Sequence, residues 1–170
     1  MGINSITYNN INSRTYGVYI SGTGVFDAPA RDREVVSVPG RNGDIIRDFG
    51  RYQNIEIAYP AFIVHSFAAN IRDFANALLE PVDYVRIEDT YHPDEYRMAL
   101  YSSGLEVLPR ARNIAGSFDI KFDCKPQRWL KSGEILTSYA NNSVLYNPTR
   151  FDALPLIVCT GNGTITLNGT

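Results

Sequence analysis

The chain has 170 residues, of which 44% are hydrophobic and 20% are charged, and its formal net charge is -2. This length suits one globular domain, or one domain and a fragment of a second. A near-neutral chain lacks the basic surface that nonspecific nucleic-acid binding requires. The first ten residues do not predict a signal peptide, and no apolar run approaches the ~20 residues of a membrane helix.

Strand-forming residues dominate the chain. Eleven Tyr and eight Phe accompany frequent Val, Ile and Thr, which favours β-structure. In chain order the pattern predicts strands over residues 5–8, 16–20, 35–38, 54–64, 84–88, 96–101, 105–108 and 111–125. The last of these is the clearest, because Phe118, Ile120 and Phe122 alternate with polar residues. Such alternation indicates an antiparallel sheet with one buried and one wet face.

A turn cluster at residues 39–44, PGRNGD, follows the first apolar segment of a long stretch from Glu34 to Val64. Pro presets φ for a turn, and Asn-Gly tolerates positive φ, so the cluster predicts a reversal between two strands. The tip carries only polar residues, Arg41, Asn42 and Asp44. We expect a hairpin that projects beyond its own core and is completed by a neighbouring molecule.

One amphipathic helix is predicted over residues 66–79. Phe67, Ile71, Phe74 and Leu78 recur at helical spacing and form the stripe that packs on the sheet. Ser66 is expected to be the N-cap, and Pro81 stops the helix.

The C-terminal part changes in composition. Residues 1–130 are expected to form the first domain, and the polar, Asn/Ser-rich residues 131–150 to form a linker. Within residues 151–170, strands are predicted at 155–160 and 164–168 around Gly161-Asn162-Gly163. We interpret this segment as the first strands of a second β domain.

Residues for catalysis are sparse, so we expect no enzyme, no cofactor and no metal site. His65 is interpreted as a packed or capping residue at a strand–helix junction. His92 lies in the acidic turn 89–95, DTYHPDE, which has the carboxylates for a hard cation but fits an exposed charged turn better. Cys124 and Cys159 have no metal-ligand spacing and are expected to be buried thiols. Arginine and aromatic residues on turns instead favour a binding surface.

Two motifs carry a resemblance to a known family. Residues 37–44, SVPGRNGD, resemble the V-P-G-R-N-G-D turn of the distal tail proteins of siphophages. Residues 115–128, AGSFDIKFDCKPQR, resemble the F-x-C-x-P-Q-R segment that ends the first domain of that family. Between them the order also matches: a helix ending in Leu-Leu, Arg-Ile-Glu-Asp at 86–89, Tyr-His-Pro at 91–93 and Tyr-Arg-x-Ala at 96–99. The likeness covers about residues 16 to 150.

The resemblance implies an antiparallel β-sandwich with one packed helix and a projecting hairpin, followed by a galectin-like β domain. It further implies a homo-hexameric ring that joins the tail tube to the baseplate and lets DNA pass through its channel. The implied partners are the tail tube protein, the tail tip protein and a receptor-binding protein, without membrane or specific nucleic-acid binding. The protein would be a virion component of a phage or prophage of a Gram-positive bacterium, made in the host cytoplasm.

Residues of the hairpin region are the candidates for the ring interface. Arg41, Asn42 and Asp44 would set the register between subunits, whereas Phe49, Tyr52 and Tyr59 would supply buried area. An alternative is a carbohydrate-binding module for cell-wall glycan, which would need exposed aromatics such as Trp129 or the Tyr-rich loops. An enzyme or metal-dependent domain is a third hypothesis and rests only on the turn 89–95.

Overall fold

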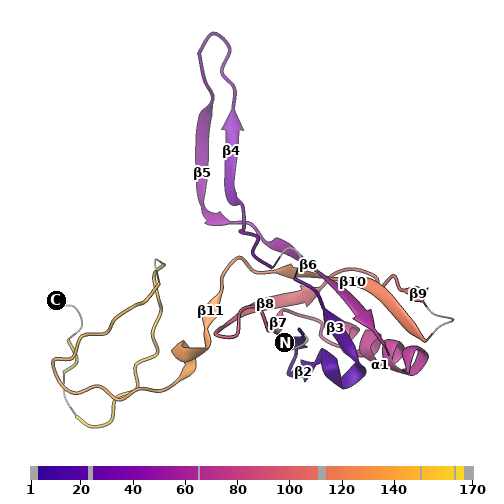
Figure 1. The fold of residues 1–170 in the computed structure, drawn as a ribbon. Coiled ribbons are helices and arrows are strands. Elements are labelled where there is room, and N and C mark those ends of the chain that lie inside the picture. The colour runs from indigo at the N-terminus through magenta and orange to yellow at the C-terminus, as the bar shows by residue number, and fades with distance from the viewer. Residues whose placement is uncertain are drawn as a thin grey trace. The chain divides into compact units, whose positions relative to one another are not determined.

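The structure, a computed structural model, describes residues 4–22, 25–64, 66–110, 114–149, 151–162 and 164–166. The chain divides into two compact units, Met1–Leu136 and Thr137–Thr170. The first unit is mainly β with one α-helix, as predicted (Figure 1). His65, which we interpreted as a packed or capping residue, lies outside the described residues.

One curled antiparallel sheet forms the body of the first unit. Its strand order is β2-β1-β7-β8-β10-β6-β3, with β9 added to β10 and β11 added to β8. The strands are β1 (Ile6–Tyr8), β2 (Ile11–Asn12), β3 (Val18–Ile20), β6 (Ile55–Ile63), β7 (Val85–Asp89), β8 (Glu95–Tyr101), β9 (Leu108–Arg110), β10 (Ala115–Cys124) and β11 (Trp129–Leu130). Short 3-10 helices occur at Ser13–Tyr16 and Lys131–Glu134. A sandwich normally consists of two separate sheets that face each other. Here one curled sheet takes the place of the two.

Strand β10 is an inner strand of this sheet, between β8 and β6. It pairs with β6 from Gly116 opposite Ile63 to Cys124 opposite Ile55. Every second residue of β10 is buried, including Phe118, Ile120 and Phe122. The predicted alternation is therefore confirmed, and it places one face of the sheet in the core.

The helix α1 (Phe67–Leu79) covers this core. Phe74 and Leu78 are buried, and Phe67 and Ile71 pack against the core at its edge, as the predicted stripe requires. Ser66 is the N-cap, but its side chain makes no capping hydrogen bond because its backbone is left-handed, with φ 50°. A capping side chain normally reaches the first turn from an extended backbone, so the predicted cap bond is wrong.

The strands β4 (Arg31–Val36) and β5 (Ile45–Tyr52) form a separate two-stranded sheet. Figure 1 shows this hairpin standing away from the sheet of the first unit, which confirms the predicted projection.

Three strand predictions are corrected at their ends. The strand expected at residues 35–38 is instead β4, which begins at Arg31 and ends at Val36. The strand expected at residues 105–108 is instead β9, at Leu108–Arg110. Leu105 and Val107 pack against the core without pairing, and pairing with β10 begins at Leu108. The strand expected from residue 111 begins at Ala115, and residues 111–113 lie outside the described part.

The second unit contains no helix or strand in residues 137–149, 151–162 and 164–166. The strand predicted at 155–160 is therefore wrong, and residues 164–166 of the other predicted strand are also irregular. A lone hairpin buries too little surface to be stable in water, which explains this difference. Cys159 is exposed, contrary to prediction, because no sheet forms here to cover it. Whether residues 151–170 begin a second β domain stays a prediction.

Within the described residues, α1 is too short and too polar to cross a membrane.

Candidate functional site

The loop of the β4–β5 hairpin follows from its turn residues. Gly40 and Gly43 have φ values of 81° and 82°, a left-handed conformation that a residue with a side chain rarely adopts. The N–H of Arg41 donates to the carbonyl of Val38 at 3.2 Å and closes the first bend. Asn42, expected to share the positive φ of the Asn-Gly pair, does not have it. The sequence therefore fixes the reversal through its two glycines.

Apolar side chains are exposed on both faces of the hairpin near its tip. Val35 lies opposite Ile46, and directly opposite residues share a face. These two side chains are 56% and 60% exposed. Val36 lies opposite Ile45, one residue further along, so this second exposed pair is on the other face.

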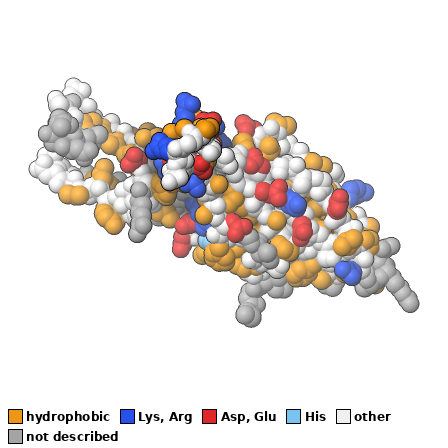
Figure 2. Space-filling view, turned by 90° about the horizontal axis from the view of Figure 1, so that it is seen from above, with side chains coloured by type: hydrophobic (Ala, Val, Ile, Leu, Met, Phe, Trp, Pro, Cys, Tyr) orange, Lys and Arg blue, Asp and Glu red, His pale blue; other side chains and the backbone are white. Residues whose placement is uncertain are grey.

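Charged pairs hold the half of the hairpin that lies nearer the sheet. The Arg31 guanidinium donates to Asp48 and lies over the Tyr52 ring at 5.5 Å. Arg51 donates to Asp32 at 2.6 Å. Seen from above in Figure 2, basic, acidic and hydrophobic side chains are mixed on the hairpin. Exposed ion pairs contribute little stability, so the hairpin has only weak internal support.

Five of the six predicted interface residues lie on this hairpin and are exposed: Arg41, Asn42, Asp44, Phe49 and Tyr52. Tyr59 does not join them. It lies on β6 with 2% of its surface exposed, and its hydroxyl donates to Asp89 at 2.9 Å. Burial, followed by the charge of Asp89, raises the pKa of Tyr59 well above its ordinary value. Tyr59 therefore belongs to the core and not to the hairpin surface.

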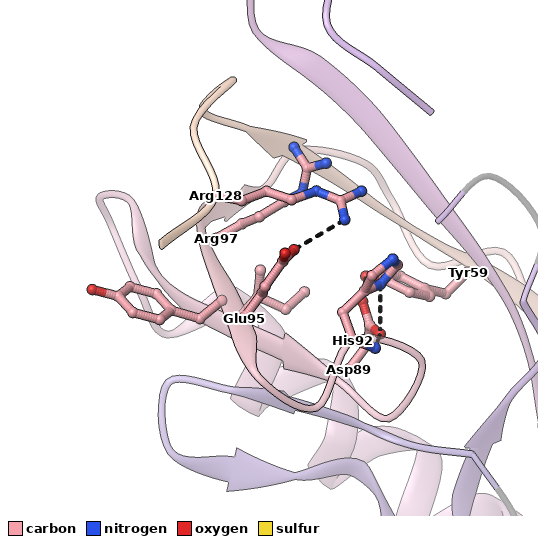
Figure 3. Close-up of a pocket in the computed structure, with 8 residues that line it drawn as sticks. Tyr59, Asp89, His92, Glu95, Arg97 and Arg128 are labelled. Carbon is pink, nitrogen blue, oxygen red and sulfur yellow. Dashed lines mark hydrogen bonds and ion pairs between the residues drawn. The ribbon is translucent and has the colours of Figure 1, made fainter. Parts of the chain in front are cut away.

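A small pocket lies where Tyr59 meets the turn after β7 (Figure 3). Asp89 is enclosed there by donors: the N–H groups of Tyr91 and His92, each at 2.8 Å, the hydroxyl of Tyr59, and the His92 ring at 3.2 Å. The carboxylate of this acidic turn is thus used to hold the turn itself. Among the residues that the structure describes, no three His, Cys, Asp or Glu side chains gather as ligands for a metal ion.

The other side of the pocket is formed by charged residues of β8 and of the segment before β11. Glu95 accepts from Arg128 at 3.1 Å, and Arg128 also donates to the carbonyl of Val25 at 3.0 Å. Arg97 lies beside Arg128 and is 7% exposed. Our sequence reasoning missed this cluster. The signal for it was present, because Arg97 is two residues from Ala99 on β8, and residues at this spacing in a strand face the same side, here the core.

The remaining aromatic and thiol candidates are packed. Trp129 stacks on Tyr96 with ring centroids 5.7 Å apart, and the Arg86 guanidinium lies over the Tyr96 ring at 3.9 Å. This arrangement leaves Trp129 half-buried at the end of the unit. Burial raises the pKa of the Cys124 thiol to about 12, so the nucleophilic thiolate is scarce at neutral pH.

A solved structure has a similar fold. It is that of SPP1 Dit (gp 19.1), described as a paradigm of the hub adsorption apparatus in Gram-positive infecting phages. The superposition gives a TM-score of 0.62 over 76% of this chain, at 14% sequence identity.

The chain has a Dit-like fold. The resemblance drawn from the turn at 37–44 and the segment at 115–128 is therefore confirmed at the level of the fold. This chain matches 53% of the Dit chain, so it spans about half the length of that protein. No family model and no curated protein matches the sequence.

Proposed function

We propose that this protein is a structural component of a phage tail, in which six copies form a ring between the tail tube and the baseplate. The Dit-like fold supports a tail role, because SPP1 Dit is described as part of an adsorption apparatus. DNA would pass through the central channel of the ring. The tail tube protein and a tail tip protein would contact its two ends, and the protein would be a virion component.

The exposed apolar pairs of the hairpin are the observation that carries the ring proposal. A two-stranded hairpin on its own is marginal, and exposed Val and Ile side chains on both faces add a cost in water. Both strand edges are also free of partner strands in the described residues. A neighbouring molecule that packs on the hairpin would remove both costs.

A ring is the assembly that fits such a contact. The hairpin and the sheet that it would meet are different surfaces, so the contact is heterologous and closes into a ring when the rotation between copies is right. Arg41, Asn42 and Asp44 at the tip are polar and exposed, and in this arrangement they set the register. Phe49 and Tyr52, with the Val35–Ile46 and Val36–Ile45 pairs, supply the apolar area. The net charge of -2 suits a channel that must release DNA.

The test is the mass of the protein by light scattering on a size-exclusion column, over a range of concentrations. We expect a species near six times the 19.0 kDa chain. The double substitution Val35→Thr and Ile46→Thr keeps β-branched side chains but makes one face of the tip polar, and it should reduce the mass to that of one chain. Val82→Thr with Leu108→Thr is the matched control, because both residues are exposed elsewhere, and it should leave the ring intact.

Circular dichroism of all variants shows whether they keep the fold. A wild-type protein that stays monomeric at every concentration contradicts self-assembly into a ring. A ring that persists in the Val35→Thr, Ile46→Thr variant contradicts the role of the hairpin while leaving the ring itself in place.

A further inference from the structure

Arg97 is the one charged side chain that is buried in the core of the described residues. It has no group of opposite charge in contact. It is 7% exposed, and its Nη1 atom is buried without a hydrogen-bond acceptor. Buried arginines are normally paired, because an uncompensated guanidinium in a low-dielectric interior is costly. An unpaired one therefore needs an explanation.

The two carboxylates that line the pocket with Arg97 already have other partners. Asp89 accepts bonds from Tyr59 and from the turn that holds His92. Glu95 pairs with Arg128, whose second amino group donates to a carbonyl. No carboxylate of a described residue lies within ion-pairing distance of Arg97.

The pocket is lined by two carboxylates, Asp89 and Glu95, and by two guanidinium groups, but Arg97 makes no ion pair with either carboxylate. Burial, followed by the charge of Arg128, lowers the pKa of Arg97, which shows that its charged form is disfavoured where it stands. Figure 3 shows the two guanidinium groups close together above the carboxylate of Glu95. What Arg97 lacks is a negatively charged acceptor in contact with its buried Nη1 atom.

The space beside these groups is small and partly open to solvent. Its volume is about 10 Å³, and Arg97, Arg128, Glu95 and His92 are among the residues that line it. A cavity of roughly 10–15 Å³ on this measure is the least that holds one water molecule, so the space is just large enough for one oxygen atom. Water would offer a hydrogen bond only, whereas a carboxylate oxygen would offer a bond and a charge together, and charge-assisted bonds are about twice as strong.

We propose that Arg97, with Arg128 beside it, is a binding site for a carboxylate group that enters the pocket from outside the chain. One oxygen of the group occupies the small space and accepts from the Arg97 guanidinium. The carboxylate belongs either to a free organic anion or to an acidic side chain of a second copy of this chain. This site is independent of the hairpin, and the proposal stands whether or not the ring forms.

The experiment uses the full chain and sodium formate, the smallest carboxylate. Nitrogen-15 NMR of the arginine side chains is recorded while formate replaces chloride at constant ionic strength, and the thermal midpoint is measured in the same solutions. We expect a saturable shift of the Arg97 signal and a rise in the midpoint. Both should be lost in Arg97→Met, which removes the charge and keeps a long side chain.

Arg110→Met is the matched control, because Arg110 is an exposed arginine on β9, and it should respond to formate like the wild type. Arg97→Lys is the second variant, in case Arg97→Met does not fold. It keeps the charge but loses the planar donor fork, so it should bind formate at least several-fold more weakly. The proposal is overturned if formate does not shift the Arg97 signal, or if it raises the thermal midpoint of Arg97→Met as much as that of the wild type.

The source of the carboxylate is found by changing the protein concentration without added formate. If the bound group belongs to a second copy, the Arg97 signal shifts as the protein assembles, and the assembled protein no longer responds to formate. If the ligand is a free anion, the formate response is the same at every concentration. Either result supports the site and identifies what fills it.

Discussion

The curled sheet of the first unit and the β4–β5 hairpin both consist of antiparallel strands, but the sheet buries many of its side chains and the hairpin buries few. Along β10 every second residue is buried, so one face of that strand lies in the core. Along β5 all residues are exposed, including Ile45, Ile46 and Phe49. The apolar residues of the sheet stabilise the chain by itself, whereas those of the hairpin stay largely exposed.

This difference teaches that apolar residues on a strand do not by themselves indicate a core. The hairpin has apolar residues at both parities of its strands, so each of its faces carries exposed apolar side chains among charged ones. What separates the two regions is the number of neighbouring strands: β10 has partners on both sides, and β4 and β5 have only each other. The missing partners define where a second molecule would bind.

The largest contrast is expected from truncating one phenylalanine in each region. Phe122 is fully buried against the rings of Tyr8, Tyr59 and Tyr101, with centroids 4.9 to 6.2 Å away. Phe122→Ala should lower the free energy of unfolding by about 3–5 kcal/mol. Phe49→Ala, at a 49% exposed position, should change it by no more than about 0.5 kcal/mol. Urea denaturation followed by circular dichroism measures both.

Assembly should show the reverse order. Phe49→Ala is expected to weaken the oligomer at a concentration where folded Phe122→Ala still assembles. Equal losses of stability in the two variants would mean that the hairpin contributes to the fold of the single chain and would remove the distinction between the regions.

A smaller contrast is expected from adding one methyl group to a glycine in each region. A Cβ at Gly116 would lie 2.3 Å from Cε2 of Phe67, so the ring at the start of α1 must move. Gly116→Ala should cost about 1–3 kcal/mol of global stability through overpacking. At Gly43 there is open space, but its φ of 82° strains any side chain by roughly 1–2 kcal/mol.

The two glycine variants should differ in where their amides open. Hydrogen exchange is expected to speed up throughout the sheet in Gly116→Ala and only along β4 and β5 in Gly43→Ala. Faster exchange in β10 of the Gly43→Ala variant would show that the hairpin and the sheet unfold together.

The sequence was most informative where a local pattern decides the structure. Three predictions of this kind are confirmed: the turn at 39–44, the apolar stripe from Phe67 to Leu78 and the alternation in 115–124. In each of them the spacing of the residues fits only one type of element. The cap bond predicted for Ser66 does not form because its backbone is left-handed, which residue type does not reveal. The strand predicted at 155–160 does not form, because strand-forming residues need a neighbouring strand to pair with and pack against.

The site residues were harder to predict for the same reason. Phe49 and Tyr52 were found because they lie on the hairpin that the turn motif predicts. Tyr59 was misplaced because it belongs to β6, whose alternation directs it into the core. Arg97 was missed since its importance depends on the occupied partners around it: Glu95 and Asp89 lie near in sequence, but their bonds to Arg128 and Tyr59 are set by the fold.

The smallest expected effect concerns acid and the charged pairs of the hairpin. The hydrogen bond from Arg31 lowers the pKa of Asp48 below its ordinary value of 3.8, and the bond from Arg51 does the same for Asp32. A carboxyl group with a lowered pKa in the folded state stabilises that state above its unfolded pKa, and this contribution is lost as the pH falls through the folded pKa. Acid should therefore loosen the hairpin before it unfolds the sheet.

Protection factors of the β4 and β5 amides, corrected for intrinsic exchange at each pH, measure this effect. We expect them to fall modestly between about pH 5 and pH 3, and less in high salt, because exposed pairs are screened. Asp48→Asn is the control, since it lacks the titrating group and its β5 amides should depend less on pH. Equal pH dependence in Asp48→Asn would show that the Arg31–Asp48 pair does not hold the hairpin and would leave the Arg51–Asp32 pair as the group that titrates.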